Sequence, residues 1–237
     1  MVLSQTAEKA IAAYGGKLLW QQARKIEAEV SVTGLAFMLK WRPYFRRARV
    51  VEAVHTSVSR ITPIGRRSGV TGVLEGPDVR LEDATGNILA DRNRARDYFV
   101  TGRRLFWWDD LDMSYFANYA TWNYFTLPAL LMNEEISWSE LRPGLLQARF
   151  PDSIPTHNRI QQFTFDLQTG LLVQHDYTAE IISPLARAAN VVLRHAKNDR
   201  GLVYASERRV TPRSPKGVAM PFPVLIHIDV HDYRLSS

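Results

Sequence analysis

The feature that most constrains the fold is a change in hydrophobic period near residue 25, after which strand-like alternation recurs almost to the C-terminus. Between Ile26 and Thr33, apolar residues alternate with Glu, Ser and Thr, which is the pattern of a strand buried on one face. Further strands, separated by turns rich in Gly, Asn and Asp, are expected at 47–61, 70–74, 79–83, 88–93, 137–140, 145–150, 159–167, 171–182, 190–197, 202–211 and 224–233. The sequence therefore predicts about eleven strands in meander order, joined by antiparallel hairpins.

Two helical regions and one irregularity interrupt this pattern. Residues 4–24 have helical spacing broken by Gly15-Gly16, and residues 109–131 form a second region whose acidic start suits a helix N-terminus. After Gly34 the alternation changes phase, and a β-bulge at Gly34 is expected to absorb that change.

A twisted open sheet of ten or more strands rarely stays flat, so this one is expected to curl. We predict a mainly β (β-rich α+β) fold, a single half-barrel domain spanning residues 1–237. In it, the N-terminal helix and the aromatic helical insert plug the opening of one curled antiparallel sheet. The concave face of such a sheet is suited to an apolar ligand.

Composition excludes several classes of protein. The absence of Cys excludes disulfide scaffolds, thiolate metal sites and a catalytic thiol. The formal charge is +6, yet there is no helix-turn-helix, finger or RNP signature, so nucleic-acid binding is not expected. No phosphate-binding loop and no Gly-x-Ser-x-Gly elbow is present.

The first residues and one uncharged stretch indicate where in the cell the protein is expected. The first residues show no basic region followed by an apolar run, so a cytoplasmic protein is expected. Residues 113–133 carry no charge, but Asn and Thr residues and Pro128 interrupt the stretch, so no transmembrane span is expected.

The second helical region begins within an unusual aromatic block. Nine aromatic side chains lie between Phe106 and Phe125. A helix that is aromatic on all sides is not an ordinary surface helix. It can be a plug packed into the core, a lid that lines a ligand site, or a contact with an oligomer or membrane surface.

A hairpin places a histidine on an apolar face. If residues 168–170 form a tight turn, Phe163 lies opposite His175 and Phe165 lies opposite Val173. By the same parity Gln161, Tyr177 and His157 extend that face. A histidine among phenylalanines is desolvated, which lowers its pKa and favours the neutral imidazole. Such a group can act as a general base or a ligand hydrogen-bonder, or it can be a satisfied core residue.

The last strand carries His227, Asp229 and His231 at alternating positions, with Tyr233 expected on the same face. Two histidines and a carboxylate are metal-ligand types. However, the three span about 13 Å of strand, so no more than two easily reach one ion without other help. A polar ligand contact and a solvated strand face are the other interpretations.

The opening Ala12-Ala13-Tyr14-Gly15-Gly16, then Trp20 and a first strand at Ile26, resembles the start of proteins with the LolA/LppX-type lipoprotein-carrier fold. The resemblance in element order covers residues 7–235. It implies an unclosed β-barrel with helices plugging the opening, and binding of lipid-like molecules. Those carriers are exported, whereas this sequence shows neither a signal peptide nor an anchor cysteine, so only apolar-ligand binding is carried over.

The expected function is binding of a hydrophobic or amphipathic small molecule on the concave face. The alternative is an enzyme on the same scaffold, an isomerase, cyclase or hydrolase of an apolar substrate, with His175 as its acid–base group. No metal and no cofactor is expected. The candidate ligand-binding residues are Trp107, Trp108, Tyr115, Tyr119, Trp122, His157, Gln161, Phe163, His175, Tyr177, His227, Asp229 and His231.

Overall fold

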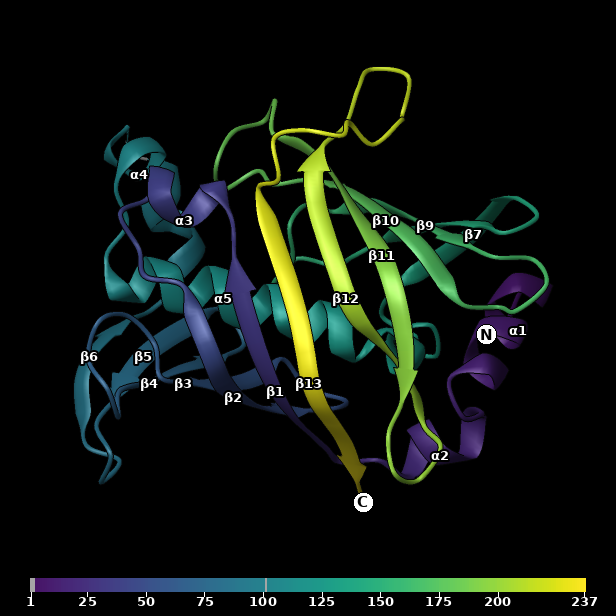
Figure 1. The fold of residues 1–237 in the computed structure, drawn as a ribbon, viewed down its shortest axis with the longest axis horizontal. Helices are drawn as coiled ribbons and strands as arrows, with labels where there is room; N and C mark the ends of the chain where they lie inside the picture. The colour runs from purple at the N-terminus through teal and green to yellow at the C-terminus, as the bar shows by residue number, and fades with distance from the viewer. Residues whose placement is uncertain (1–2, 101) are drawn as a thin grey trace.

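A computed structural model describes residues 3–100 and 102–237, and its main element is one curled antiparallel sheet (Figure 1). Within these residues the sheet has thirteen strands: β1 (Lys25–Thr33), β2 (Phe45–Ala53), β3 (Val58–Thr62), β4 (Thr71–Glu75), β5 (Asp78–Glu82), β6 (Ile88–Arg92), β7 (Ser137–Arg142), β8 (Leu145–Arg149), β9 (Ile160–Phe165), β10 (Leu172–Thr178), β11 (Arg187–Lys197), β12 (Val203–Pro212) and β13 (Ile226–Ser236). The helices are α1 (Gln5–Ala13), α2 (Lys17–Gln22), α3 (Leu35–Leu39), the 3-10 helix η1 (Ala95–Val100), α4 (Arg103–Phe106), α5 (Asp110–Phe125) and α6 (Leu127–Leu130).

The strand order across the sheet is β6-β5-β4-β3-β2-β1-β13-β12-β11-β10-β9-β8-β7. The chain builds outward from β1 to β6, crosses through α5, and returns from β7 to β13, so the first and last strands pair in the middle. Strands β6 and β7 are the two edges, and the sheet is open. The predicted fold class is confirmed, with two differences. First, there are thirteen strands rather than about eleven, and the predicted strand at 47–61 is divided into β2 and β3. Second, the meander consists of two halves, β1–β6 and β7–β13, which are joined by the pairing of β1 with β13.

The bulge expected at Gly34 is wrong, because the next five residues form α3 instead of a strand. Gly34 has φ 130°, and a Cβ there would lie 2.3 Å from the carbonyl oxygen of Leu225. The backbone N–H groups of Leu35 and Ala36 donate to the carbonyls of Val224 and Leu225. The segment before β13 thus lies so close to residue 34 that only a glycine fits there, and its carbonyls accept from the first N–H groups of α3. The chain therefore leaves the strand and enters a helix at this glycine.

Helix α5 packs against the concave side of the sheet and contacts β3, β4 and β5 (Figure 1). Its start is fixed by a reciprocal capping box, in which the side chains of Asp109 and Asp112 each accept from the other's backbone N–H. Arg92 binds both carboxylates, at 2.7 and 2.6 Å. At Gly72 in β4 a Cβ would lie 2.3 Å from the Ser114 hydroxyl, so glycine allows helix and strand to approach closely.

Buried apolar residues form two clusters. The larger lies between α5 and the central strands and includes Trp20, Ile61 and Tyr119. The smaller joins α1, α6 and β8–β10 and includes Trp122 and Phe163. The expected break in the N-terminal helix is confirmed, because Gly15 and Gly16 separate α1 from α2 at φ 106° and 90°.

None of the helices in the described part of the chain is both long enough and apolar enough to cross a membrane.

Candidate functional site

An apolar cavity lies between α5 and the concave face of the sheet, next to α3. Its lining comes from β1, α3, β2, α5 and β13 and includes Phe37, Phe45, Met113, Phe116 and Ile228. The cavity volume is about 60 Å³, room for roughly two molecules the size of water. A longer ligand can therefore enter only if the walls of the cavity move apart.

Two cations line the α3 end of this cavity. Arg42 pairs with Asp110 in the first turn of α5, with an Nη1–Oδ1 distance of 2.5 Å. The Lys40 ammonium lies 5.2 Å from the centre of a Trp108 ring, and burial lowers the pKa of Lys40 to about 8. Lys40 also donates to the carbonyl of Leu105. These contacts tie α3 to the segment before α5 at this end of the cavity.

Large apolar side chains are exposed on α3, α4 and nearby segments. Met38, Trp41 and Phe106 are each more than 60% exposed, and Phe222 in the loop before β13 is 74% exposed. Since the backbone of Leu35 bonds to that loop and Lys40 bonds to Leu105, these side chains lie around the α3 end of the cavity.

The structure divides the aromatic candidates into two groups. Trp108 lines the cavity and Trp107 is partly exposed beside Arg42. Tyr115, Tyr119 and Trp122 are buried and lie outside the cavity lining. Trp122 belongs to the smaller cluster, and its indole N–H donates to the carbonyl of Ala53 at 2.8 Å.

His157 is fully buried in a ring of phenols. Its Nδ1 lies 3.2 Å from the Tyr119 hydroxyl, and its Nε2 lies 2.9 Å from the Tyr124 hydroxyl. The imidazole stacks on the ring of Tyr177 with centroids 3.7 Å apart. Burial lowers the pKa of His157 to about 3, so the imidazole is neutral at pH 7.

His175 is buried on the concave face as the alternation predicts, directly opposite Phe163. Its ring stacks on Phe163 with centroids 4.1 Å apart, and its Nε2 lies 2.6 Å from the side-chain amide oxygen Oε1 of Gln161. Burial lowers the pKa of His175 well below its usual value. The pairing of Phe165 with Val173 is wrong, because a bulge after Leu172 puts Leu172 opposite Phe165.

Neither buried histidine lines the apolar cavity, although Tyr124 and Tyr177 do. Each imidazole has a hydrogen-bond partner and a ring stacked on it, which is the arrangement of a satisfied core group.

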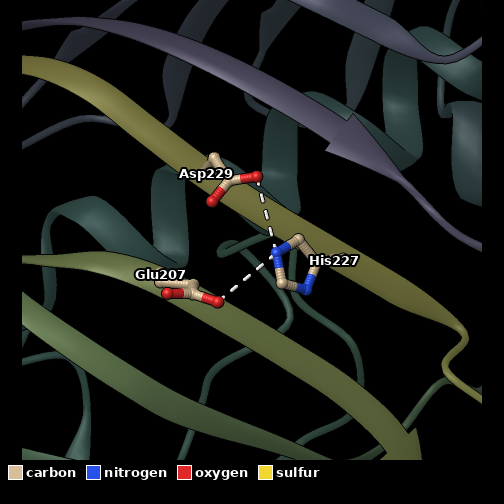
Figure 2. A group of neighbouring side chains, drawn as sticks. All are labelled: Glu207, His227 and Asp229. Atoms are coloured by element: carbon tan, nitrogen blue, oxygen red, sulfur yellow. Dashed lines mark ion pairs between the residues drawn. The ribbon is translucent and has the colours of Figure 1, made fainter.

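His227, Asp229 and Glu207 gather on the convex face of the sheet (Figure 2). The Nε2 atom of His227 lies 3.6 Å from Glu207 and 3.4 Å from Asp229. In the described residues these three are the set whose donor atoms lie close enough to bind one metal ion. Arg194 pairs with Glu207 at 3.2 Å, so one of the two carboxylates already has a cation partner, and Arg209 is the cross-strand neighbour of His227.

His231 lies apart from this group. A bulge in β13 makes Asp232 the partner of Glu29 and Val230 the partner of Val30, which leaves His231 unpaired in the ladder and bonded to Ser31 at 2.8 Å. The expectation that Tyr233 shares the face of His227 is wrong, because this bulge turns Tyr233 into the core, where it donates to the carbonyl of Phe125.

Two buried charged residues were missed in the sequence. Glu52 on β2 is 1% exposed, and burial raises its pKa to about 8. Arg208 on β12 is 3% exposed. Both could have been found, because each occupies a core-facing position of its strand alternation, between apolar or small residues.

A larger groove of about 700 Å³ lies beyond η1. Charged side chains, including Arg94, Arg96, Asp152 and Glu180, make up much of its lining. Arg96 and Glu180 pair across it at 2.9 Å. This groove is less suited to an apolar molecule than the smaller cavity under α5.

Comparison with known proteins bears on the fold. No protein-family model matches the chain, and no curated protein matches its sequence. A LolA superfamily protein from Nitrosomonas europaea superimposes with a TM-score of 0.55 at 9% identity, over 100% of this chain and 95% of that one. A domain from Vibrio parahaemolyticus, named for outer membrane lipoprotein sorting, has a TM-score of 0.51 at 10% identity, over 98% of this chain and 92% of that one. These similarities span the whole open sheet and its helices, and the chain therefore has the LolA-like fold.

Proposed function

We propose that the protein binds a hydrophobic or amphipathic small molecule between α5 and the concave face of its sheet. The observation that carries this proposal is the cavity under α5, whose wall is almost entirely apolar and aromatic. An apolar cavity gains free energy when an apolar molecule fills it, because water inside makes few hydrogen bonds. The lipoprotein-sorting name of the Vibrio parahaemolyticus domain supports a ligand of this class.

Entry is proposed at the α3 end. There side-chain contacts rather than a strand border the cavity, and exposed apolar side chains such as Trp41 and Phe106 lie around it. Opening the Arg42–Asp110 contact and moving α3 outward enlarges the cavity without breaking a pair of sheet strands.

Binding without chemistry is favoured over the enzyme alternative. A catalytic base must reach its substrate directly or through one water. His157 and His175 are enclosed by aromatic rings and lie outside the cavity lining.

The test is titration with Nile red, a neutral dye that fluoresces in apolar sites, followed by displacement with 1-dodecanol. Ala120 on α5 lines the cavity, so Ala120→Leu fills much of its volume and should abolish dye binding. The matched control is Ala196→Leu on β11, outside the cavity, which should bind like the wild type. Equal dye binding by the wild type and by Ala120→Leu would place the dye elsewhere and refute the proposal.

A further inference from the structure

A buried arginine lies beside the proposed ligand cavity. Arg208 is on the concave face of β12, where its cross-strand neighbours are Val192 and Ile228. It is 3% exposed, and among the described residues its electrostatic partners are tyrosines rather than carboxylates. A charge buried in this way costs several kcal/mol unless an opposite charge and hydrogen bonds compensate it.

The side chain of Arg208 has N–H donors that no acceptor satisfies in the described part of the chain. Its Nη2 donates to the carbonyl of Tyr124 at 3.3 Å, and its carbon lies 5.3 Å from the centre of the Tyr124 ring. Its Nε and Nη1 atoms are buried and have no hydrogen-bond partner in the described part of the chain. Burial lowers the pKa of Arg208, but arginine remains protonated near neutral pH.

Arg208 lines a small pocket of about 20 Å³, whose other lining residues are mostly aromatic and include Tyr14, Trp20 and Tyr233. The hydroxyl groups of Tyr14 and Tyr233 have partners already. The Tyr14 hydroxyl lies 2.9 Å from His195 Nε2 and accepts from the backbone of Leu172, and the Tyr233 hydroxyl donates to the carbonyl of Phe125. Arg208 is therefore the group that an anion in this pocket would meet.

The pocket and the apolar cavity adjoin. Tyr124 lines both of them, and Ile228, which lines the cavity, is the direct cross-strand partner of Arg208. Directly opposite residues of an antiparallel pair have Cβ atoms only about 5 Å apart. A single elongated molecule can thus reach from the cavity to the guanidinium when the Tyr124 ring moves.

We infer that Arg208 binds the anionic head group, a carboxylate, of an amphipathic ligand whose apolar part occupies the cavity under α5. This inference rests on the proposed function and adds the charge of the ligand to it. The head group supplies the negative charge and the acceptor oxygens that the fold leaves out around Arg208. A neutral alcohol of equal chain length has one acceptor oxygen but no negative charge.

The experiment compares laurate with 1-dodecanol, which has the same chain length but no charge. The affinity of each ligand is measured by displacement of Nile red at pH 8, at ligand concentrations too low for aggregation. The wild type should bind laurate at least tenfold more tightly than dodecanol, the ratio expected of one charge-assisted hydrogen bond. Arg208→Met should lose that preference and keep its affinity for dodecanol. Arg209→Met, one residue along and on the opposite face, should behave like the wild type.

Several outcomes separate the two proposals. If neither Nile red nor dodecanol binds the wild type, the proposed function itself fails. If both ligands bind equally, or if Arg208→Met still prefers laurate, the inference about Arg208 is wrong while the proposed function stands. If millimolar acetate raises the melting temperature in an Arg208-dependent way and laurate has no advantage, the site takes a small free anion, and the head-group inference is overturned.

Arg208→Met should fold, because replacing a buried unpaired charge by an apolar side chain removes a desolvation cost. A melting temperature at or above that of the wild type is the expected control result. Should Arg208→Met fail to fold, Arg208→Lys retains the charge but loses the guanidinium. It should weaken laurate binding about tenfold and leave dodecanol unchanged, whereas unchanged laurate binding would contradict the inference.

Discussion

The buried carboxyl of Glu52 makes a specific prediction about stability and pH. Glu52 is 1% exposed on β2, beneath α5, with the Ser59 hydroxyl 3.2 Å from its Oε1. Burial raises its pKa to about 8 in the folded protein, against 4.5 for an ordinary glutamate. The folded state therefore holds a proton that the unfolded state releases. The stabilisation is complete below pH 4.5 and is lost as the pH rises toward 8.

In the interval from pH 6.5 to 8, the wild type is compared with Glu52→Gln, because the other shifted groups contribute equally to both proteins. The buried histidines, whose pKa values are lowered, and Lys40, with a pKa of about 8, each raise the unfolding free energy by about 0.4 kcal/mol across this interval. Linkage between pKa values of 4.5 and about 8 gives an opposing loss of about 1.6 kcal/mol that belongs to Glu52 alone.

The assay is urea denaturation at pH 6.5, 7, 7.5 and 8. Glu52→Gln keeps the shape of the side chain but cannot ionise, so its unfolding free energy relative to the wild type should increase by about 1.6 kcal/mol between pH 6.5 and 8. Glu75→Gln, at an exposed position on β4, is the matched control and should follow the wild type. Equal slopes for the wild type and Glu52→Gln would show that Glu52 is not the protonated group and would refute the reasoning.

Three further predictions concern other residues. Trp122→Ala should lower the unfolding free energy by roughly 3–5 kcal/mol, because Trp122 lies in the smaller core cluster, yet leave Nile red affinity of the folded protein unchanged; a large loss of affinity would place Trp122 in the binding site. His175→Gln should keep dodecanol affinity within tenfold, and NMR of the wild type should show no titration of His175 near pH 6.5, since the ring is buried and stacked on Phe163; an ordinary titration would contradict its burial. Because Arg194 and Arg209 lie beside Glu207 and His227, one equivalent of Zn²⁺ should leave the melting temperature unchanged; a rise that disappears in His227→Ala would reveal a metal site.

Local patterns predicted much of the fold. Alternation and turn residues gave the strand positions, the antiparallel hairpins and the pairing of Phe163 with His175. The paired glycines Gly15-Gly16 likewise predicted the break between α1 and α2. Each of these features depends on neighbours in sequence, which is why one chain suffices to predict it.

Features set by distant contacts were not predictable in this way. The pairing of β1 with β13 joins segments about 200 residues apart, and α3 forms because that same region approaches Gly34. The bulge at His231 moved Tyr233 to the other face. Arg208 was visible at a core-facing position, but its lack of a carboxylate partner appears only when all neighbouring strands are in place. The cytoplasmic location and the single-domain division stay predictions.

The central claim is that the space between α5 and the sheet holds an apolar molecule, and native mass spectrometry tests it most directly. After incubation with 1-dodecanol, the folded wild type should show a one-to-one complex, and Ala120→Leu should show the unbound mass. Ala196→Leu should form the complex as the wild type does. An unbound mass for the wild type, or an equally abundant complex for Ala120→Leu, would contradict the account.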